Sequence, residues 1–352
     1  MAYTTIDDPT IYFQNKLYTG NGSTQSITLD GDTDMQPDWV WIKSRSDTYA
    51  HILHDSARGA TKELKSSGTN AEGTDSNGLT SFDSDGFSLG TGGSVNNNNS
   101  TYVAWNWKTG TAFSNDVSST SVGTIDSAGS VNDTAGFSII KYTGNGTSGA
   151  TTKHGLSTKP DWMIVKNRDE ADSWQVYHHK NTSAPATETI QLNETGATSD
   201  TSNRWNDTEP TTTLLTLGDN TTVNKNTVQY VGYIFSEKKG YSKFGTYTGN
   251  NNADGTFVNV GFKPAWVMVK STSSTDHWRM HDNKRIGSSG TAPLYPHLSN
   301  AEPSANFTFE LLSNGFKWRN TDGDANGSNT YIYMAFAESP FVNSKGVPNN
   351  AE

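Results

Sequence analysis

The chain of 352 residues contains no cysteine. Disulfide frameworks, thiolate zinc sites and cysteine nucleophiles are therefore excluded. It also lacks any apolar run near the roughly 18 residues that a membrane-spanning helix needs. Residues 1–9 carry neither the basic n-region nor the apolar h-region of a signal peptide. We therefore expect no membrane insertion and no export through the usual signal.

Basic residues are scarce as well, with 26 Lys and Arg against 36 Asp and Glu and a formal net charge of −10. Because no Lys/Arg-rich run is present, the sequence argues against binding to a nucleic-acid backbone. Only 32% of the residues are hydrophobic, but 10 Trp, 14 Tyr and 14 Phe are among them. Each aromatic side chain can bury roughly 150–250 Å². The chain is therefore expected to fold, and its length predicts two or three domains.

Five landmarks recur in the same order in three stretches of the chain. They are a Tyr-Thr-Gly-Asn turn, a Pro-x-Trp strand, a lysine six residues after that proline, a histidine-containing pair and a closing tyrosine strand. The turns begin at Tyr18, Tyr142 and Tyr247, the strands at Pro37, Pro160 and Pro264, and the lysines are Lys43, Lys166 and Lys270. The pairs are His54-Asp55, His178-His179 and His281-Asp282, and the closing strands start at Tyr102, Tyr230 and Tyr331. The recurrence predicts three copies of one module.

The three modules are assigned to residues 10–108, 135–239 and 240–341, after an N-terminal arm at residues 1–9. Residues 109–134 are dominated by Ser, Thr, Gly and Asp, with isolated apolar residues such as Phe113 and Ile125. That composition predicts a linker or a strap lying on the surface. Residues 342–352 are expected to form a loose tail.

Within a module the apolar residues repeat with a period of two rather than 3.6. In the first closing strand Val103, Trp105 and Trp107 share one face, whereas Tyr102 and Asn106 lie on the other. Residues 39–42 and 162–165 are continuous apolar runs, which indicate strands buried on both faces. No apolar stripe of three helical turns occurs. The sequence therefore predicts an all-β protein of three tandem antiparallel β-sandwich modules of jelly-roll type, with under about a tenth of the residues in helices.

One acidic loop, at residues 322–327, has the spacing of the first half of a calcium-binding loop, with Asp322, Asp324 and Asn326 as candidate ligands. Against this interpretation, Tyr333 stands where the bidentate glutamate is expected, and the matching turns of the other modules lack the acids. A polar hairpin tip is the alternative. We predict no other cofactor.

The histidine-containing pairs could provide metal ligands or a general base. A metal site needs three or four convergent ligands, however, and no further histidine recurs in register. Their presence in every module favours a structural role at a strand end. Since every landmark recurs and no nucleophile elbow, phosphate loop or His-Glu-x-x-His motif is present, we predict that the protein is not an enzyme.

Two tryptophans do not fit the core pattern. Trp205 lies in a wholly polar segment beside Arg204 and Asp207, and Trp318 lies between Lys317 and Arg319. An exposed indole with such neighbours could stack on a sugar ring while the polar groups bind hydroxyls. The alternative is packing against a neighbouring module or subunit. Trp174 and Trp278, which precede the histidine landmark in two modules, are expected in the core.

With these motifs in view, the sequence resembles a family of uncharacterised virion proteins of marine tailed bacteriophages. The resemblance covers residues 1 to about 341, and it is carried by the opening residues 1–9, the strands at 36–43 and 264–270, and residues 102–108 and 240–245. It implies a structural component of a phage particle, fibre-like or decoration-like, with lectin-like β-sandwich modules and no active site.

Such a protein would be assembled in the host cytoplasm and exposed on the virion surface, in contact with other virion proteins. Two roles remain open. A tail fibre or host-recognition appendage, expected by resemblance to be a trimer, would bind cells or host-surface glycans through several modules at once. A head decoration or scaffold protein would cover the particle without binding the host. Residues 1–15 could serve as a docking arm in either role.

Overall fold

A computed structural model describes residues 3–287, 290–304 and 309–348. All pairs of strands that form ladders are antiparallel, and each helix is a single turn of three or four residues. The expected all-β class is therefore confirmed. No helix in this part of the chain has the length and apolar character to span a membrane.

Residues 10–108, 135–239 and 240–341 are called repeats 1, 2 and 3 below. Repeat 1 and its entry contain η1 (Pro9–Ile11), β1 (Phe13–Thr19), β2 (Gln25–Ile27), β3 (Trp39–Ser44), β4 (Ile52–Asp55), β5 (Lys62–Lys65), β6 (Gly73–Thr74), β7 (Leu79–Asp83), β8 (Gly86–Leu89), α1 (Gly93–Asn96) and β9 (Thr101–Trp107). The segment before repeat 2 contains β10 (Thr111–Asn115), α2 (Val117–Thr120) and β11 (Ser127–Asn132).

Repeat 2 contains β12 (Phe137–Thr143), β13 (Ala150–Lys153), β14 (Trp162–Asn167), β15 (Gln175–His178), η2 (Pro185–Thr187), β16 (Glu188–Gln191), β17 (Ser199–Asp200), α3 (Ser202–Trp205), β18 (Leu214–Leu217), α4 (Thr221–Asn224) and β19 (Gln229–Phe235). Repeat 3 contains β20 (Ser242–Thr248), β21 (Phe257–Asn259), β22 (Phe262–Ser271), β23 (Arg279–Asp282), β24 (Ile286–Gly287), β25 (Gly290–Thr291), β26 (Phe309–Leu312), β27 (Gly315–Trp318), α5 (Gly323–Asn326) and β28 (Thr330–Pro340).

Each repeat forms one larger and one smaller antiparallel sheet with the same strand order, and repeat 3 has in addition the two-stranded sheet β24-β25. The larger sheets are β1-β9-β3-β4-β5-β6, β12-β19-β14-β15-β16-β17 and β20-β28-β22-β23. The smaller sheets are β2-β8-β7, β13-β18 and β21-β27-β26. The closing tyrosine strand therefore lies between the turn strand and the Pro-x-Trp strand in every repeat.

Residues 109–134 are not the linker that their composition predicts. They form the hairpin β10–β11, which pairs with β12 and extends the larger sheet of repeat 2 to eight strands. Backbone pairing does not require a strong apolar pattern, so composition alone is a weak guide here. Because repeats 1 and 3 have no such hairpin among their described residues, this extension breaks the equivalence of the repeats.

The Pro-x-Trp strands are buried on both faces, as their continuous apolar runs predict. On one face of β3, Val40 and Ile42 pack with Phe87 and Leu89 of the smaller sheet in a cluster that belongs to repeat 1 alone. Equivalent clusters fill repeats 2 and 3. The other face of each larger sheet is directed out of its own repeat.

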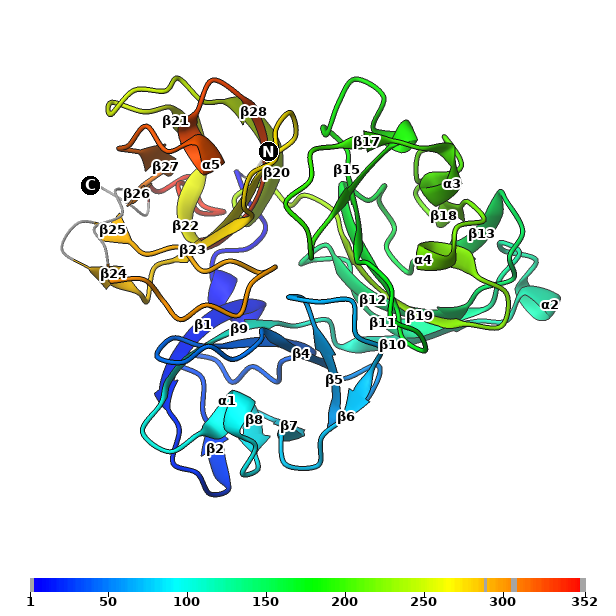
Figure 1. The fold of residues 1–352 in the computed structure, drawn as a ribbon, viewed down its shortest axis with the longest axis horizontal. Coiled ribbons are helices and arrows are strands. Elements are labelled where there is room, and N and C mark those ends of the chain that lie inside the picture. The colour runs from blue at the N-terminus through cyan, green and yellow to red at the C-terminus, as the bar shows by residue number, and fades with distance from the viewer. Residues whose placement is uncertain (1–2, 288–289, 305–308, 349–352) are drawn as a thin grey trace.

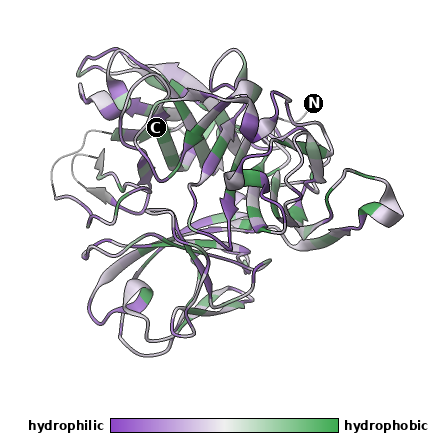
Figure 2. Ribbon diagram, turned by 45° about the vertical axis from the view of Figure 1, so that its right-hand side comes forward, coloured by the Kyte–Doolittle hydropathy of each residue, from purple (hydrophilic) through white to green (hydrophobic). Residues whose placement is uncertain are grey.

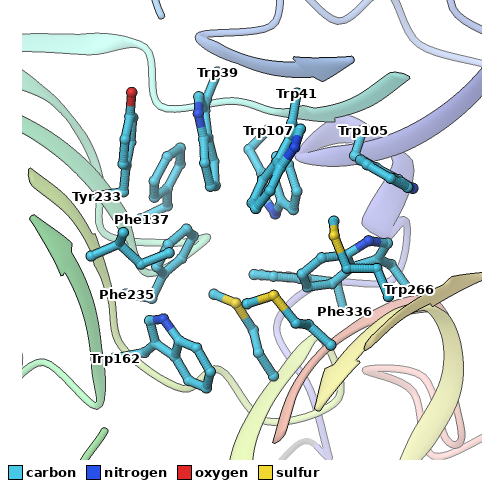
Figure 3. Close-up of a cluster of buried hydrophobic side chains, with 14 of the residues drawn as sticks. Trp39, Trp41, Trp105, Trp107, Phe137, Trp162, Tyr233, Phe235, Trp266 and Phe336 are labelled. Atoms are coloured by element: carbon cyan, nitrogen blue, oxygen red, sulfur yellow. The ribbon is translucent and has the colours of Figure 1, made fainter. Parts of the chain in front are cut away.

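These outward faces meet in one central cluster to which all three repeats contribute. The Pro-x-Trp tryptophans Trp39, Trp162 and Trp266 lie in it, each at most 1% exposed. Trp39 stacks on Tyr233 of repeat 2 with 4.4 Å between the ring centroids. The ring centroid of Phe336 in repeat 3 lies 5.7 Å from that of Phe235 in repeat 2. Figure 3 shows these rings converging from all sides. The face that carries Trp105 and Trp107 is thus core, as expected, but the core is shared between repeats.

The three repeats are consequently arranged around this cluster as a closed ring (Figure 1). Apolar residues concentrate on the strands, and hydrophilic residues follow the connecting loops (Figure 2). The expected docking arm is part of the ring from residue 3 onward: the Tyr3 hydroxyl donates to the Gly261 carbonyl at 2.6 Å, and Ile6 is buried. In the expected loose tail, Ser344 binds Asp7 through its backbone N–H at 2.6 Å.

Candidate functional site

The recurring polar pairs occupy strand ends at the contacts between repeats. Asp55, His178 and Asp282 each lie opposite a Pro-x-Trp tryptophan in the neighbouring strand. The expected alignment of His178-His179 with the two His-Asp pairs is therefore wrong by one residue. A constant spacing of twelve residues after Lys43, Lys166 and Lys270 sets the true register.

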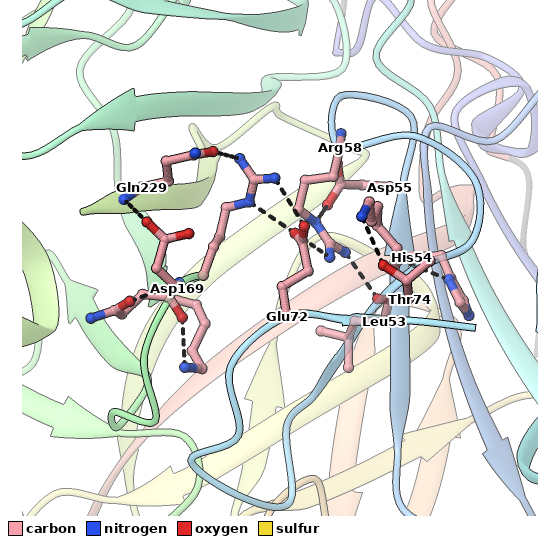
Figure 4. A network of polar contacts seen from close by, with 12 residues as sticks. Leu53, His54, Asp55, Arg58, Glu72, Thr74, Asp169 and Gln229 are labelled. Atoms are coloured by element: carbon pink, nitrogen blue, oxygen red, sulfur yellow. Dashed lines mark hydrogen bonds and ion pairs between the residues drawn. The ribbon is translucent and has the colours of Figure 1, made fainter. Parts of the chain in front are cut away.

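At the contact between repeats 1 and 2, Asp55 is the centre of a buried ionic network (Figure 4). Asp55 and Arg58 form an ion pair with no side-chain exposure. Tyr233 of repeat 2 donates its hydroxyl hydrogen to Asp55 Oδ2 at 2.7 Å. Glu72 connects two arginines: its Oε2 lies 3.2 Å from Arg58 Nη1 and 2.8 Å from Nε of Arg168 in repeat 2. Although burial raises the pKa of Glu72, hydrogen bonds and charges from the two arginines hold it below its usual value.

The contact between repeats 3 and 1 repeats this network at equivalent positions. Asp282 and Arg285 form a buried pair at 2.6 Å. Trp105 of repeat 1, which occupies the strand position of Tyr233, donates its Nε1–H to Asp282 Oδ2 at 3.0 Å. Glu302 joins Arg285 to Arg45 of repeat 1. Two of the three contacts thus contain matching sets of two acidic and two basic side chains, whose charges cancel.

The contact between repeats 2 and 3 has the same geometry without these charges. His178, Asn181, Thr198 and Thr272 replace the aspartate, the first arginine, the glutamate and the second arginine. Thr198 N–H donates to the Thr272 carbonyl at 3.0 Å, as Glu72 N–H does to the Arg168 carbonyl at 2.7 Å. The Thr198 hydroxyl donates to Asn181 Oδ1 at 2.7 Å. All four residues are neutral, because burial lowers the pKa of His178 well below 6.5, so this contact contains no unpaired charge.

Indole hydrogen bonds connect the repeats in the same direction around the ring. Trp174 of repeat 2 donates its Nε1–H to the Lys65 carbonyl of repeat 1 at 3.0 Å. Trp278 of repeat 3 donates to the Gln191 carbonyl of repeat 2 at 2.9 Å. Both tryptophans are buried, as expected. These indoles and the polar residues at the strand ends therefore serve the contacts between repeats.

The recurring lysines are fully buried and satisfy loop carbonyls. Lys43, Lys166 and Lys270 each donate to the carbonyl of the following residue, at 2.6, 2.7 and 2.7 Å. Burial lowers the pKa of each ammonium group to about 8. Their role is to close the loop after the Pro-x-Trp strand.

Trp205 is not exposed, so the expectation of an indole free to stack on a sugar is wrong. The residue ends the one-turn helix α3 and lies, with 0% exposure, in the cluster of repeat 2. Asn206 and Asp207 follow with φ values of 53° and 49°. This left-handed pair turns the chain sharply, so the indole points inward although its sequence neighbours are polar. Arg204 lies at the surface, on the wall of a small concavity.

Trp318 is likewise buried, in the cluster of repeat 3. It occupies the inward face of β27, while Lys317 and Arg319 on either side bind Asp254 outside at 2.7 and 2.8 Å. Strand alternation explains both positions. In a strand, an apolar residue whose two sequence neighbours are cationic can therefore be buried.

The residues of the expected calcium loop have protein partners. Asp322 caps α5, and Arg279 donates to Asp322 at 2.6 Å and to Asp324 at 2.7 Å. Asn326 is buried and donates to the Asn252 carbonyl at 2.9 Å. Asn96 and Asn224 are buried in the same way in repeats 1 and 2. Within the described ranges no group of three or more metal-ligating side chains occurs.

A large groove lies where the β10–β11 extension meets repeat 2. It has a volume of about 620 Å³ and is lined by side chains of the extension, of β12 and of Arg168 and Gln229. Asp116 and Asp126 lie on one wall and Lys141 on the opposite strand. Lys141 forms no ion pair or side-chain hydrogen bond with any residue that the structure describes, so its ammonium group is available to a ligand. The groove offers donors, acceptors and both signs of charge.

Sequence reasoning missed this groove because its residues belong to the segment assigned as a linker. The available signal was the weak alternation in residues 111–115 and 127–132 together with the acids Asp116 and Asp126. A concave polar surface built by a hairpin that has no counterpart among the described residues of repeats 1 and 3 is the strongest candidate for a binding site.

Comparison with known proteins places the chain in one family. A family model described as a domain of unknown function, DUF7483, matches residues 8–340. The chain belongs to this family. No curated protein and no solved structure matches it.

Replacing Asp55 with Ala should reduce the free energy of unfolding by about 3–5 kcal/mol, because Arg58 would lose its fully buried carboxylate partner and the network would keep a buried positive charge that is not compensated. Lys159→Ala is the matched control, since Lys159 and Glu209 form an exposed pair worth about 1 kcal/mol or less. Urea unfolding of both variants measures the difference. Equal, small effects would contradict the interpretation of the network as a structural necessity.

Stability should fall as the pH drops below 6.5, because burial keeps five histidines from accepting protons. Burial lowers the pKa of His54 and His297 to about 3, of His154 to about 4, and of His51 and His178 well below 6.5. The unfolded chain then binds more protons than the folded chain, and stability is lost by up to about 1.4 kcal/mol per pH unit for each histidine.

Urea unfolding between pH 7 and pH 4.5 tests this expectation. Replacing His154 with Gln should reduce the loss of unfolding free energy over this pH range by the contribution of one histidine. A stability that stays constant over this range would show that these side chains are not excluded from protonation in the folded state.

Proposed function

We propose that this family member is a non-enzymatic structural protein of a bacteriophage particle that serves as a tail fibre or host-recognition appendage. The sequence resemblance to phage virion proteins gives the setting. The observation that carries the proposal is the placement of the polar residues at the strand ends: in all three repeats they lie at the contacts that hold the ring together. Polar residues that recur at contacts between repeats favour a role as a rigid scaffold over a role in catalysis.

Each repeat, in this proposal, is a β-sandwich of jelly-roll or lectin-like form. The pairing of a larger with a smaller sheet around one apolar cluster in each repeat supports it. Sandwiches of this kind expose loops and sheet edges on which binding sites can vary while the core is kept.

Host contact is assigned to repeat 2 and to a glycan of the cell surface. The groove beside the extension has hydroxyl, amide, carboxylate and ammonium groups on its walls, which is the chemistry needed to bind sugar hydroxyls. One groove per chain would bind weakly. Assembly of chains into a homo-oligomer, for which we favour a trimer, would present several grooves to one surface and increase avidity.

A head decoration or scaffold protein is the second candidate. The ring arrangement favours it, because three repeats of the same strand order present related surfaces to neighbours around a particle, and a covering protein needs contacts with other virion proteins but no receptor. The two candidates differ in location and in host binding.

Replacing Lys141 with Ala should weaken binding of the purified protein to host cells at least tenfold without lowering the melting temperature, because the free ammonium group lies in the groove. Lys180→Ala is the control, since Lys180 is an exposed lysine of the same repeat outside the groove. Flow cytometry with labelled protein gives the affinities.

Immunogold electron microscopy of intact particles gives the location. Gold at the tail together with cell binding that Lys141→Ala reduces supports the appendage. Gold over the head and no cell binding by the unaltered protein would favour the decoration role instead.

A further inference from the structure

A second concavity on repeat 2, separate from the groove, contains a cation that forms no ion pair with any residue that the structure describes. It has a volume of about 250 Å³ and lies between β16, the loop around Gly196, and α3. None of its lining residues lines the groove. Among the described residues that line it, Arg204 is the only basic one and none is acidic.

Arg204 is exceptional among the seven arginines of the chain. The other six each form an ion pair with a carboxylate. Arg204 donates one hydrogen bond, from Nη1 to Asn203 Oδ1, and its Nε is buried without a hydrogen-bond partner in the described chain. Burial lowers its pKa, and the charge of Asp172 opposes this only in part. A half-buried guanidinium group that forms no ion pair has unused hydrogen-bond donors, which an anionic ligand can satisfy.

The backbone beneath Arg204 is fixed by packing. Trp205 anchors the helix in the cluster of repeat 2, and Gly218 N–H donates to the Arg204 carbonyl at 2.8 Å. A Cβ atom at Gly218 would lie 2.3 Å from the backbone of Asn203, so only glycine permits this close approach. The guanidinium group is therefore presented from a rigid support, which reduces the entropy lost on binding.

Hydroxyl and amide side chains make up most of the remaining polar lining. Ser199, Thr201 and Gln191 lie around the concavity with Asn203 and Asn220. Such groups suit the hydroxyls of a sugar ring, whereas the planar fork of an arginine suits the two oxygens of a carboxylate or sulfate.

We propose that this concavity binds the acidic group of a saccharide, a carboxylate or a sulfate ester, with Arg204 as the residue that recognises the anion. The inference rests on the proposed function in taking a glycan as the ligand class, and it narrows that class to acidic glycans. Trp205 acts as the support of the site and does not touch the sugar.

Isothermal titration with four probes tests the site: trigalacturonate, galactose 6-sulfate, neutral maltotriose and inorganic sulfate. Binding of at least one acidic saccharide is expected, more than tenfold tighter than that of maltotriose and of inorganic sulfate. Arg204→Gln should weaken the acidic saccharide at least tenfold, and Arg204→Lys should be intermediate because charge without the fork remains. Arg319→Gln, which removes an exposed arginine of repeat 3, should have no effect.

A second variant keeps the test decisive if Arg204→Gln unfolds. Gly196 lines the concavity, and a Cβ atom there would meet nothing within 4 Å. Gly196→Phe should therefore fold and block the site. The proposal is overturned if neither acidic saccharide binds, if inorganic sulfate binds as tightly as they do, or if Gly196→Phe and Arg204→Gln bind like the unaltered protein. If these variants still bind host cells like the unaltered protein, the proposed function is kept and the role of this concavity in it is rejected.

Discussion

The sharing of one aromatic core by three repeats is the constraint on which the other features depend. Each larger sheet buries one face inside its own repeat and the other face against the two remaining repeats. A repeat alone would expose Trp39 and its neighbours, or their counterparts around Trp162 or Trp266, to water. At roughly 25 cal/mol per Å² of buried apolar surface, rings of this size make association within the chain strongly favourable. The Pro-x-Trp motif recurs because each copy must supply a tryptophan to the same centre.

Polar groups at the edge of this core determine how the repeats are placed. Two contacts use a buried Asp-Arg-Glu-Arg set, and the third uses His178, Asn181, Thr198 and Thr272 at the same positions. Removing one member of a buried ionic set leaves a charge without compensation, whereas replacing the whole set by neutral groups is tolerated. The concerted change at the contact between repeats 2 and 3 follows this rule. Repeat 2 also carries the β10–β11 extension, the groove and the Arg204 concavity, so several departures from equivalence lie in this one repeat.

Much of the fold could be predicted from the sequence, because period-two patterns and a triple set of landmarks report burial and strand order directly. The surface against which each buried face packs could not be predicted. The pattern around Trp105 predicts a core residue whether the side chain packs within its own repeat or against Asp282 of another repeat. Trp205 shows a second limit: a left-handed turn at Asn206 and Asp207 buries an indole whose neighbours are all polar. The groove was missed for a third reason, because residues 109–134 are held by backbone pairing rather than by an apolar pattern.

Differential scanning calorimetry tests the shared core most directly, on the unaltered chain and on the variants Trp39→Ala and Phe257→Ala. Trp39 belongs to repeat 1 but contacts repeat 2, whereas Phe257 is an exposed side chain of repeat 3, 42% accessible. A common core predicts one unfolding transition whose calorimetric and van't Hoff enthalpies agree. Trp39→Ala should move the whole transition to lower temperature, by an amount corresponding to about 3–5 kcal/mol, and Phe257→Ala should leave it in place. Separate transitions for the repeats, with only one of them shifted by Trp39→Ala, would contradict the account.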